Sequence, residues 1–156
     1  MNMSKLDAID YQILNLLQQN ARLTNQNIAD KVHLSASPCW RKIKKLEDMA
    51  IIEGYGVRLN RKKLGLGVMV FVKVVIDHHS EEEAKKFEQE VECLDHVIAC
   101  YSIGGDADFL LQVVAKDLDE YAHFSMNVIR RLSGIKEMQS MFVLKEIKKF
   151  NGFPIG

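Results

Sequence analysis

Apolar residues in the first fifty positions recur at helical spacing and predict three short helices. We expect the first helix to begin near Ser4, with Asp7 as a weak capping partner. Its apolar stripe comprises Leu6, Ile9, Ile13, Leu16 and Leu17. After a turn at residues 20–23, Thr24 is placed to cap a second, short helix. The apolar residues of that helix are Ile28, Ala29 and Val32.

The third predicted helix covers residues 35–49, SASPCWRKIKKLEDM, after a tight connection at residues 33–34. Cys39, Ile43 and Leu46 form one apolar stripe, Ser35 is a candidate N-cap, and Pro38 lies in the first turn. No acidic residue occurs before Glu47. The outer face is therefore cationic and carries Trp40, Arg41, Lys42, Lys44 and Lys45.

Three helices with a short turn between the last two predict a helix-turn-helix unit, whose last helix reads DNA in the major groove. The alternative is an ordinary core helix with a solvated basic face. Residues 51–59, IIEGYGVRL, indicate a strand or wing leading out of this unit. We take residues 1–59 as the first domain and the basic, glycine-containing residues 60–67 as a hinge.

The second domain, residues 68–156, reads as β-α-β-β-α-β. Strands are predicted at residues 68–76, 96–103, 109–115 and 139–147. Ser80 with Glu83 is predicted to cap one helix, and Asp117 with Glu120 the other, which Gly134 would end. This order is the ferredoxin-like pattern, so the fold class is α+β. Such a sheet leaves one apolar face without helices, and we expect it to form a homodimer. A dimer would match two DNA half-sites about one helical turn apart.

Charge is unevenly distributed along the chain, although the net charge is zero. Residues 1–63 contain 11 Lys and Arg against 6 Asp and Glu, whereas residues 64–156 contain 10 against 15. A basic first part joined to an acidic second part favours a polyanion-binding module on a non-binding domain. No apolar run is long enough to span a bilayer, and the N-terminus lacks the apolar segment of a signal peptide. We therefore expect a cytoplasmic protein that does not bind membranes.

Several segments, in this order and spacing, resemble the Lrp/AsnC (feast/famine) family of transcriptional regulators over nearly the whole chain. They are LDAIDYQIL (6–14), NARLTNQNIADKV (20–32), LSASPCWRKIKKLEDMAIIEGY (34–55), NRKKLG (60–65) and GGDADFLL (104–111). The resemblance implies a winged or plain helix-turn-helix and a ferredoxin-like domain for amino-acid regulation. It also implies dimers that often assemble into octamers, with effectors bound near the glycine–aspartate loop between dimers. The family usually has glycine at the positions of His33 and Ala50, so both residues would be strained if their φ is positive.

For DNA, the residues near the start of the third helix are the better candidates for reading bases: Ser35, Ser37, Trp40 and Arg41. Lys44 and Lys45 are expected to contact DNA phosphates, and Lys42 belongs to the same cationic face. Arg22, in the turn at residues 20–23, could add a contact with the DNA backbone. Trp40 has an alternative role, in which it packs against the wing.

For the effector, Gly104 and Gly105 allow close approach of a carboxylate, and Asp106 or Asp108 can receive an ammonium group. The family arrangement adds Tyr101, Gln139 and Ser140 as wall residues. The alternative is a plain hairpin turn, which uses the same residue types. Apolar surroundings favour Leu or Met as the effector, although the same residues also suit a core: Phe109, Leu110, Met126, Met138 and Met141.

Other chemistries find less support in the sequence. Cys39, Cys93 and Cys100 lack CxxC spacing, and His78, His79, His96 and His123 fit no zinc pattern, so we predict no metal and no cofactor. No catalytic constellation or nucleotide-binding fingerprint emerges, so we predict no enzyme. Two alternatives stay open: an acylphosphatase-like enzyme on the ferredoxin-like fold, and a ligand-binding assembly module whose basic helix meets an acidic protein.

Overall fold

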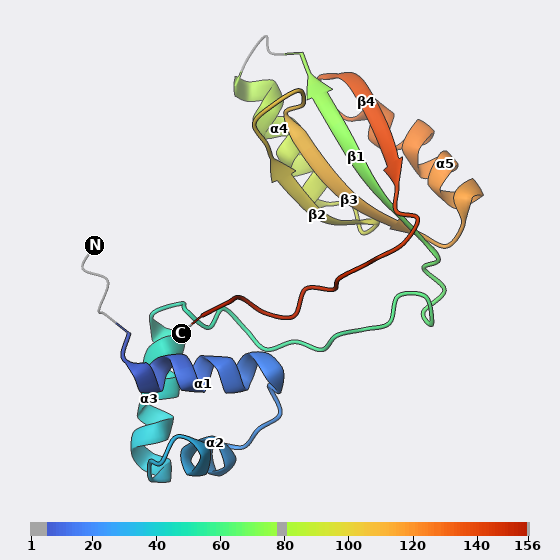
Figure 1. Cartoon of the computed structure of the whole chain (residues 1–156). Coiled ribbons are helices and arrows are strands. Elements are labelled where there is room, and N and C mark those ends of the chain that lie inside the picture. Colours follow the sequence, from blue (N-terminus) through green and yellow to red (C-terminus); the bar gives the residue numbers. More distant parts are fainter. Residues whose placement is uncertain (1–5, 78–80, 156) are drawn as a thin grey trace. The chain divides into compact units, whose positions relative to one another are not determined.

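The structure, a computed structural model, describes residues 6–77 and 81–155 and divides into two units (Figure 1). The helical unit comprises the chain up to Arg58 together with a C-terminal tail, residues 148–155. The sheet unit comprises residues 59–147. We expected the second domain to continue to residue 156, but the last residues instead pack on the first domain.

Three helices form the helical unit: α1 (Ala8–Gln19), α2 (Asn25–Lys31) and α3 (Ala36–Asp48). The apolar stripes predicted for the three helices meet in one buried core, since Ile13, Ile28, Cys39 and Leu46 are almost fully buried. Burial of these side chains is the main force that holds helices this short, because isolated helices of this length are marginal in water. Trp40, the chain's single tryptophan, lies on the outside of α3.

The N-termini of α1 and α2 are both closed by capping boxes. Thr24 accepts a hydrogen bond from the Asn27 amide, as its position predicts. The predicted start of α1 near Ser4 was wrong, because the cap is Asp7 and the helix begins at Ala8. Asp7 Oδ1 accepts from the Asp10 amide at 2.9 Å, and Asp10 Oδ2 accepts from the Asp7 amide at 3.0 Å. Ser4 itself lies outside the described residues.

The strand or wing predicted over residues 51–59 is absent from the described chain. After α3 these residues run without strand pairing, and Val57 and Leu59 are largely exposed. A β-rich segment forms a strand only where a partner strand supplies hydrogen bonds, and among the described residues of the helical unit no strand is present to pair with this segment.

The C-terminal tail is bound to α1 by side-chain amides and by one apolar side chain. Gln18 accepts a hydrogen bond from the Phe153 amide at 2.6 Å and donates to the Phe153 carbonyl at 3.2 Å. Asn15 donates to the Ile155 carbonyl at 3.0 Å, and Ile155 packs against the helical core. Gly152, beside Gln18, adopts φ +96°, a backbone conformation that residues other than glycine rarely adopt. The tail is thus folded onto α1 as part of the helical unit.

We predict that Gln18→Ala lowers the free energy of unfolding of the helical unit by roughly 1 kcal/mol, because both hydrogen bonds to Phe153 are lost. Urea unfolding followed by Trp40 fluorescence reports on this unit. Gln19→Ala, one position along on the exposed side of α1, serves as the control. Equal stability of the two variants would show that the tail contributes nothing.

The sheet unit has the predicted ferredoxin-like order. Its elements are β1 (Val68–Ile76), α4 (Glu81–Glu92), β2 (Val97–Ser102), β3 (Phe109–Ala115), α5 (Leu118–Asn127), the 3-10 turn η1 (Ile129–Arg131) and β4 (Ile135–Phe142). The strands pair antiparallel in the order β2-β3-β1-β4, so β1 is central and β2 and β4 are edges (Figure 1).

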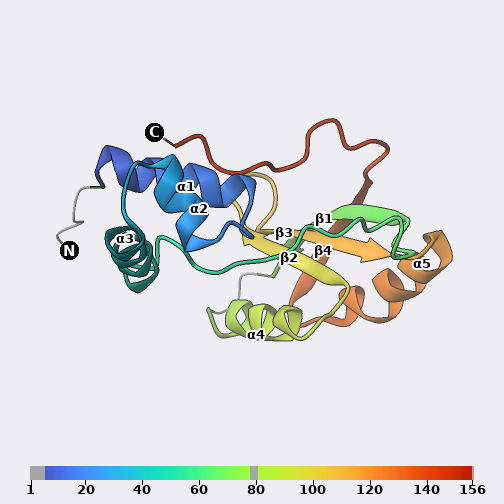
Figure 2. The same ribbon diagram turned by 90° about the horizontal axis from the view of Figure 1, so that it is seen from below.

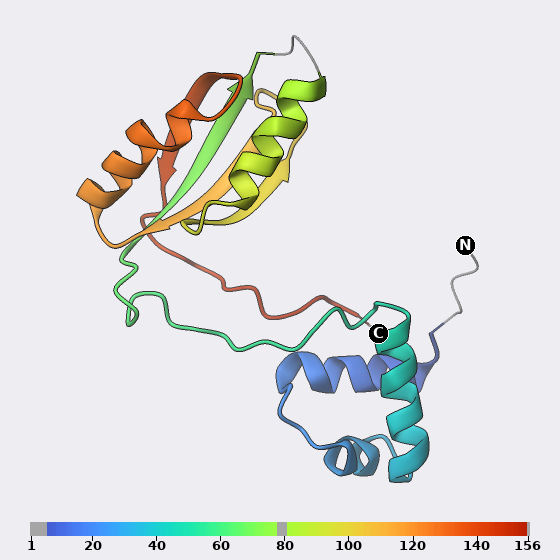
Figure 3. The ribbon, with the colours of Figure 1, turned by 180° about the vertical axis from the view of Figure 1, so that it is seen from behind.

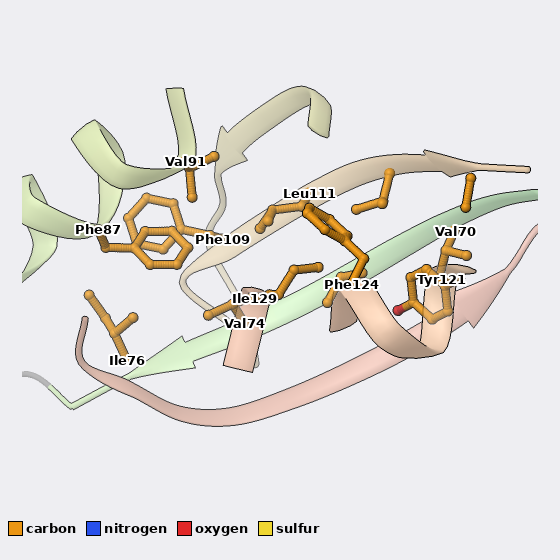
Figure 4. Packing of buried hydrophobic residues seen from close by; sticks show 13 residues of the cluster. Val70, Val74, Ile76, Phe87, Val91, Phe109, Leu111, Tyr121, Phe124 and Ile129 are labelled. Carbon is orange, nitrogen blue, oxygen red and sulfur yellow. The ribbon is translucent and has the colours of Figure 1, made fainter. Parts of the chain in front are cut away.

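Both helices cover the same face of this sheet (Figures 2 and 3). The core lies between the helices and that face, and Figure 4 shows α4 and α5 side chains packed on alternate strand residues. The Phe87 and Phe109 rings pack against each other with centroids 4.7 Å apart and planes tilted by 40°. The opposite face, which we call the open face, is covered by none of the helices that the structure describes.

Three details of the sheet unit differ from the predictions or lie outside the description. β4 begins at Ile135 and not at Gln139, because pairing with β1 extends to the residue after Gly134. Gly134 has φ +71° but does not end α5, which closes at Val128 and is followed by η1. Asp117 caps α5 as predicted, whereas the Ser80 cap of α4 falls on a residue outside the described chain.

The predicted hinge, residues 60–67, is folded into a turn of the sheet unit. The Arg61 guanidinium donates to the carbonyls of Leu66 and Gly67 at 2.7 and 2.8 Å. Gly67 lies so close to the Lys116 carbonyl that a Cβ would approach it to 2.8 Å. The entry of the chain into β1 is therefore fixed by hydrogen bonds and close packing.

Candidate DNA interface and effector site

Two turns with positive φ define the position of α3. After α2, His33 adopts φ +56° and the Leu34 amide donates to the Ala29 carbonyl at 2.9 Å. After α3, Ala50 adopts φ +53°, and the Ile51 amide donates to the Leu46 carbonyl at 3.0 Å. Such six-residue closures favour glycine at the left-handed position. The chain therefore has the turn geometry of a helix-turn-helix despite carrying histidine and alanine there.

We predict that Ala50→Gly raises the stability of the helical unit by roughly 0.5–1 kcal/mol, because a left-handed conformation costs an L-residue about 1–2 kcal/mol that glycine does not incur. Urea unfolding followed by Trp40 fluorescence measures the change. Ala21→Gly, at an exposed position where φ is not positive, is expected to be neutral or destabilising. A loss of stability in Ala50→Gly would contradict the strain.

The N-terminus of α3 is fixed by a neighbouring helix and not by its own cap side chain. Ser35 has the extended backbone of an N-cap residue, but its hydroxyl accepts no capping hydrogen bond, contrary to our expectation. Instead, the Asn25 side-chain amide donates to the Ala36 carbonyl at 2.8 Å. The hydroxyls of Ser35 and Ser37 are left on exposed residues at the end of the helix that would enter a groove.

Most of the predicted DNA-contacting residues share the exposed surface of the helical unit: Arg22, Ser35, Ser37, Trp40, Arg41, Lys44 and Lys45. Arg41 donates to the Ser37 hydroxyl at 3.2 Å, which holds the guanidinium along the helix. Lys44 reaches Asp48 at 3.0 Å. Trp40 is 57% exposed and lines a hollow of about 300 Å³ together with Tyr55 and Ile43.

Tyr55 brings the segment after α3 back onto that helix. Its hydroxyl donates to Glu47 at 2.9 Å, and burial together with this bond raises the pKa of Tyr55 to about 12. The expected wing is thus an irregular segment, but it still contributes a wall beside Trp40.

Lys42 differs from the other cations of α3 because its ammonium is used inside the helical unit. Lys42 Nζ lies 2.6 Å from Asp7 Oδ2 and 2.8 Å from Asp10 Oδ1, and Asp10 is 2% exposed. Partial burial opposes the charge, but the hydrogen bonds to Asp10 and Asp7 raise the pKa of Lys42 overall. The same bond lowers the pKa of Asp7. Lys42 joins α3 to the cap of α1, so we leave it out of the DNA contacts proposed below.

Lys42→Met leaves the buried Asp10 carboxylate without its cation, so we predict a loss of roughly 1–3 kcal/mol in unfolding free energy. Lys45→Met, on the exposed face, is the matched control and is expected to change stability by less than about 0.5 kcal/mol. Thermal unfolding of both variants gives the comparison. If Lys42→Met leaves stability unchanged, the structural role of Lys42 is contradicted and Lys42 becomes a candidate DNA contact again.

At the other candidate site, strand register places a polar row across the open face. Tyr101 of β2 pairs with Leu110 of β3, Leu110 pairs with Lys73 of β1, and Lys73 pairs with Gln139 of β4. Tyr101 and Gln139 are exposed, whereas Leu110 and Lys73 are half-buried. Two of the predicted wall residues are thus aligned. Lys73, which was not among the predicted effector residues, lies between them.

Ser140 lies on the opposite side of the sheet from this row. Consecutive strand residues point to opposite faces, so Ser140 follows Gln139 onto the helix-covered face. There its hydroxyl is hydrogen-bonded to the Tyr121 hydroxyl, in the layer beneath α5. The structure therefore separates Ser140 from the other predicted effector residues.

The two aspartates of the loop at residues 103–108 have different roles. Asp108 Oδ2 accepts from the Ile76 amide at 2.9 Å, and the Asp108 amide donates to the Val74 carbonyl at 2.9 Å, so this residue ties the loop to β1. Asp106 is 78% exposed, and both its oxygens accept from Lys73 Nζ, at 2.9 and 2.7 Å. Those bonds lower the pKa of Asp106. Of the two carboxylates, Asp106 is therefore the exposed one, whereas Asp108 is used to hold the loop on β1.

The surroundings of the loop fit a small ligand only in part. Gly105 has φ +131°, which requires glycine, and a Cβ at Gly104 or Gly105 would meet no atom within 4 Å. Phe109 and Met138 belong to the core beneath the helices, and Met126 is an exposed residue of α5. Leu110 lies on the open face within the polar row, whereas Met141 lies on that face beside Phe71, outside the row.

The described chain shows neither a metal-binding cluster nor a membrane-spanning helix. Among residues 6–77 and 81–155 no group of three or more His, Cys, Asp or Glu side chains is arranged to hold a metal ion. His78 and His79 lie outside the described residues. None of the helices that the structure describes has the length and apolar character needed to cross a membrane.

Comparison with known proteins assigns a family to each of the two units. Residues 6–53 match a family described as winged helix-turn-helix DNA-binding, and residues 69–153 match the Lrp/AsnC ligand binding domain. The DNA-binding transcriptional activator DecR of Escherichia coli K12 is 34% identical over 96% of this chain and 99% of its own. The leucine-responsive regulatory protein of Haemophilus influenzae is 32% identical, covering 94% of this chain and 88% of its own.

A solved structure, a transcriptional regulator of Neisseria meningitidis in complex with L-Met, matches with a TM-score of 0.92 and 36% identity over 96% of this chain and 97% of its own. A helix-turn-helix unit joined to a ferredoxin-like ligand-binding domain defines a ligand-responsive regulator of transcription. The chain belongs to the Lrp/AsnC family, and it is a DNA-binding transcriptional regulator with an amino-acid-binding domain. The predicted resemblance and fold class are confirmed.

Proposed function

We propose that this regulator binds double-stranded DNA through the exposed face of α3 and responds to L-Met or L-Leu at the loop of residues 103–108. The observation that carries the proposal is the exposed set of serines and cations at α3, together with the polar row and Asp106 on the open face. The Met complex of the Neisseria relative and the name of the Haemophilus relative support these two amino acids.

In the DNA complex, Ser35, Ser37, Trp40 and Arg41 read base edges, because they lie toward the N-terminal end of α3. Lys44, Lys45 and Arg22 contact phosphates, which fixes register without reading sequence. The Arg41–Ser37 hydrogen bond pre-orders the guanidinium for a bidentate contact with a guanine. We accordingly place the protein in the cytoplasm, where it would encounter DNA.

We propose a homodimer formed by the open face, with further assembly to an octamer. Met69, Phe71 and Met141 lie on this face toward the start of β1, away from the row that contains Lys73. These side chains are only half-buried in the single chain, and apolar surface of this kind favours association. A dimer would place two α3 helices against two half-sites about 34 Å apart. The apolar end of the face is thus assigned to assembly and the polar end to the effector.

The two alternatives receive less support. The relatives matched above are regulators of transcription, which disfavours an acylphosphatase-like enzyme. An acidic protein partner for α3 would produce salt-dependent binding without a preferred DNA sequence.

For DNA binding, we predict that Lys45→Met weakens binding to every sequence alike and reduces the slope of log affinity against log salt by about one. Arg41→Ala should instead cost about 1–3 kcal/mol on the preferred site and relax base preference there. Fluorescence anisotropy across a salt series, on a site obtained by in vitro selection, measures both. Lys136→Met, an exposed lysine of β4, is the control. Failure to select any preferred sequence would exclude specific DNA reading.

For the effector, we predict that L-Met or L-Leu raises the melting temperature in a concentration-dependent way, since a ligand that binds only the folded state stabilises it. Asp106→Ala should remove the shift, whereas Asp95→Ala, an exposed carboxylate before β2, should retain it. Light scattering with and without the ligand tests whether assembly changes. If neither amino acid nor any of the other eighteen shifts the melting temperature, the effector proposal fails.

A further inference from the structure

We infer that the C-terminal tail, residues 148–155, is a second tether of the helical unit and sets how strictly the protein selects the spacing between two DNA half-sites. The first tether is the segment that follows α3. Asn15, Gln18 and Gly152 are the positioning residues, because they hold the tail on α1. The inference rests on the proposed function, since it concerns how two helical units of a dimer meet one DNA site.

The tail is held on α1 mainly through its backbone. The Gln18 side chain uses both ends of its amide on Phe153, since its oxygen accepts from the Phe153 amide and its nitrogen donates to the Phe153 carbonyl. Asn15, three positions earlier on the same face of α1, donates to the Ile155 carbonyl. A Cβ at Gly152 would lie 2.6 Å from Gln18 Oε1, so a side chain there would displace the amide that binds Phe153. These contacts give the tail a defined position on the helix.

Each connection is anchored in the helical unit, and the two anchors lie on different helices. After α3, the Ile51 and Ile52 amides both donate to the Leu46 carbonyl, at 3.0 and 3.2 Å. The tail is anchored along α1 instead. Between these anchors, Arg58 Nη1 donates to Asn151 Oδ1 at 2.9 Å and bridges the two connections. The helical unit is thus attached at the end of one helix and on the side of another.

Each connection is also anchored in the sheet unit, at neighbouring strands. Before β1, the Gly67 amide donates to the Lys116 carbonyl at 3.2 Å. After β4, the Val143 amide donates to the Met69 carbonyl of β1 at 3.0 Å. The stretch from Val143 to Asn151 is short, because it reaches at most about 28 Å when fully extended. A short stretch that is anchored at both ends permits little movement.

Two anchored connections restrain the rotation of the helical unit, which a single connection does not. A single segment limits distance, but its φ and ψ torsions leave the attached unit free to turn. In a dimer, restrained rotation fixes the spacing and the helical phase at which two α3 helices meet the duplex, whose phase repeats about every 10.5 bp. Binding to the second half-site is then favoured only at the matching spacing. With the tail released, we expect the protein to accept more spacings, each with a smaller gain from the second half-site.

The test compares the selected DNA site with the same site carrying about 5 bp more between its half-sites, which turns one half-site to the opposite side of the duplex. In anisotropy titrations of the full-length protein, this insertion should lower affinity by about tenfold or more. Gly152→Ala places a methyl group against Gln18 on a left-handed backbone, so it should release the tail and reduce the loss to less than about threefold. Gly54→Ala is the matched control, because a Cβ there meets no atom within 4 Å, and it should behave like the unmodified protein.

A second variant releases the tail from the side of the helix. Asn15→Ala combined with Gln18→Ala removes the side-chain amides that bind Phe153 and Ile155, and it should match Gly152→Ala. Release is measured directly by trypsin cleavage after the exposed Lys148 and Lys149, which should be faster in both variants. Affinity for a single half-site should be unchanged in both, which shows that the helical unit is still folded.

The outcomes separate the tether from DNA binding itself. If cleavage is faster but the insertion still costs the variants as much affinity as the unmodified protein, the inference is overturned while the proposed function stands. The same holds if neither variant speeds cleavage, or if the unmodified protein binds both spacings equally well. If selection yields no preferred sequence for the unmodified protein, the inference and the proposed DNA reading are both overturned.

Discussion

The pairing of β1 with β3 on one side and with β4 on the other is the constraint on which the sheet unit depends. Side chains alternate along a strand, so this register sends Val70, Val72 and Val74 into the core beneath the helices. The same register sends Met69, Phe71 and Lys73 to the open face. A slip of one residue would exchange the two sets, placing a lysine in the core and exposing three valines. Core and candidate site are therefore fixed by one set of backbone hydrogen bonds.

In the helical unit the corresponding constraint is the pair of left-handed turns on either side of α3. They set the angles at which α3 leaves α2 and at which the chain departs after Ala50. The bonds from Lys42 to Asp7 and Asp10 then fix α3 against α1. The strain at His33 and Ala50 is offset by the buried core, because burial of apolar side chains contributes far more than one or two kcal/mol. The orientation of the cationic face is thus set by these turns and bonds.

The two units are joined by the chain twice. Residues 59–67 lead from the helical unit into β1, and β4 leads through residues 143–147 back to the tail that binds α1. The polar row includes Lys73 of β1 and Gln139 of β4, so each connection adjoins a strand that contributes to the candidate effector site. Regulation still requires that the effector bind two assembly or DNA-binding states with different affinity.

Much of this architecture could be predicted from the sequence alone, because helices, caps and turns depend on residues that are only a few positions apart. Helical stripes, the capping pairs at Thr24 and Asp117, the glycine–aspartate loop and the order of strands follow from patterns of a few residues. The family resemblance also marked His33 and Ala50 as positions that would be strained if their φ were positive, and the structure shows that both are positive. What the sequence left undecided were pairings between distant residues. Lys42 and Lys45 have the same chemistry, and only the packing of α1 on α3 turns one inward. Gln139 and Ser140 are neighbours in the chain, and only the register of β4 on β1 places them on opposite faces. The tail, too, joins the first domain because Gln18 and Asn15 happen to face it once α1 has formed. Composition and periodicity determined the elements, whereas the tertiary structure decided which charges and amides meet, since those contacts depend on atoms that the chain brings together only on folding.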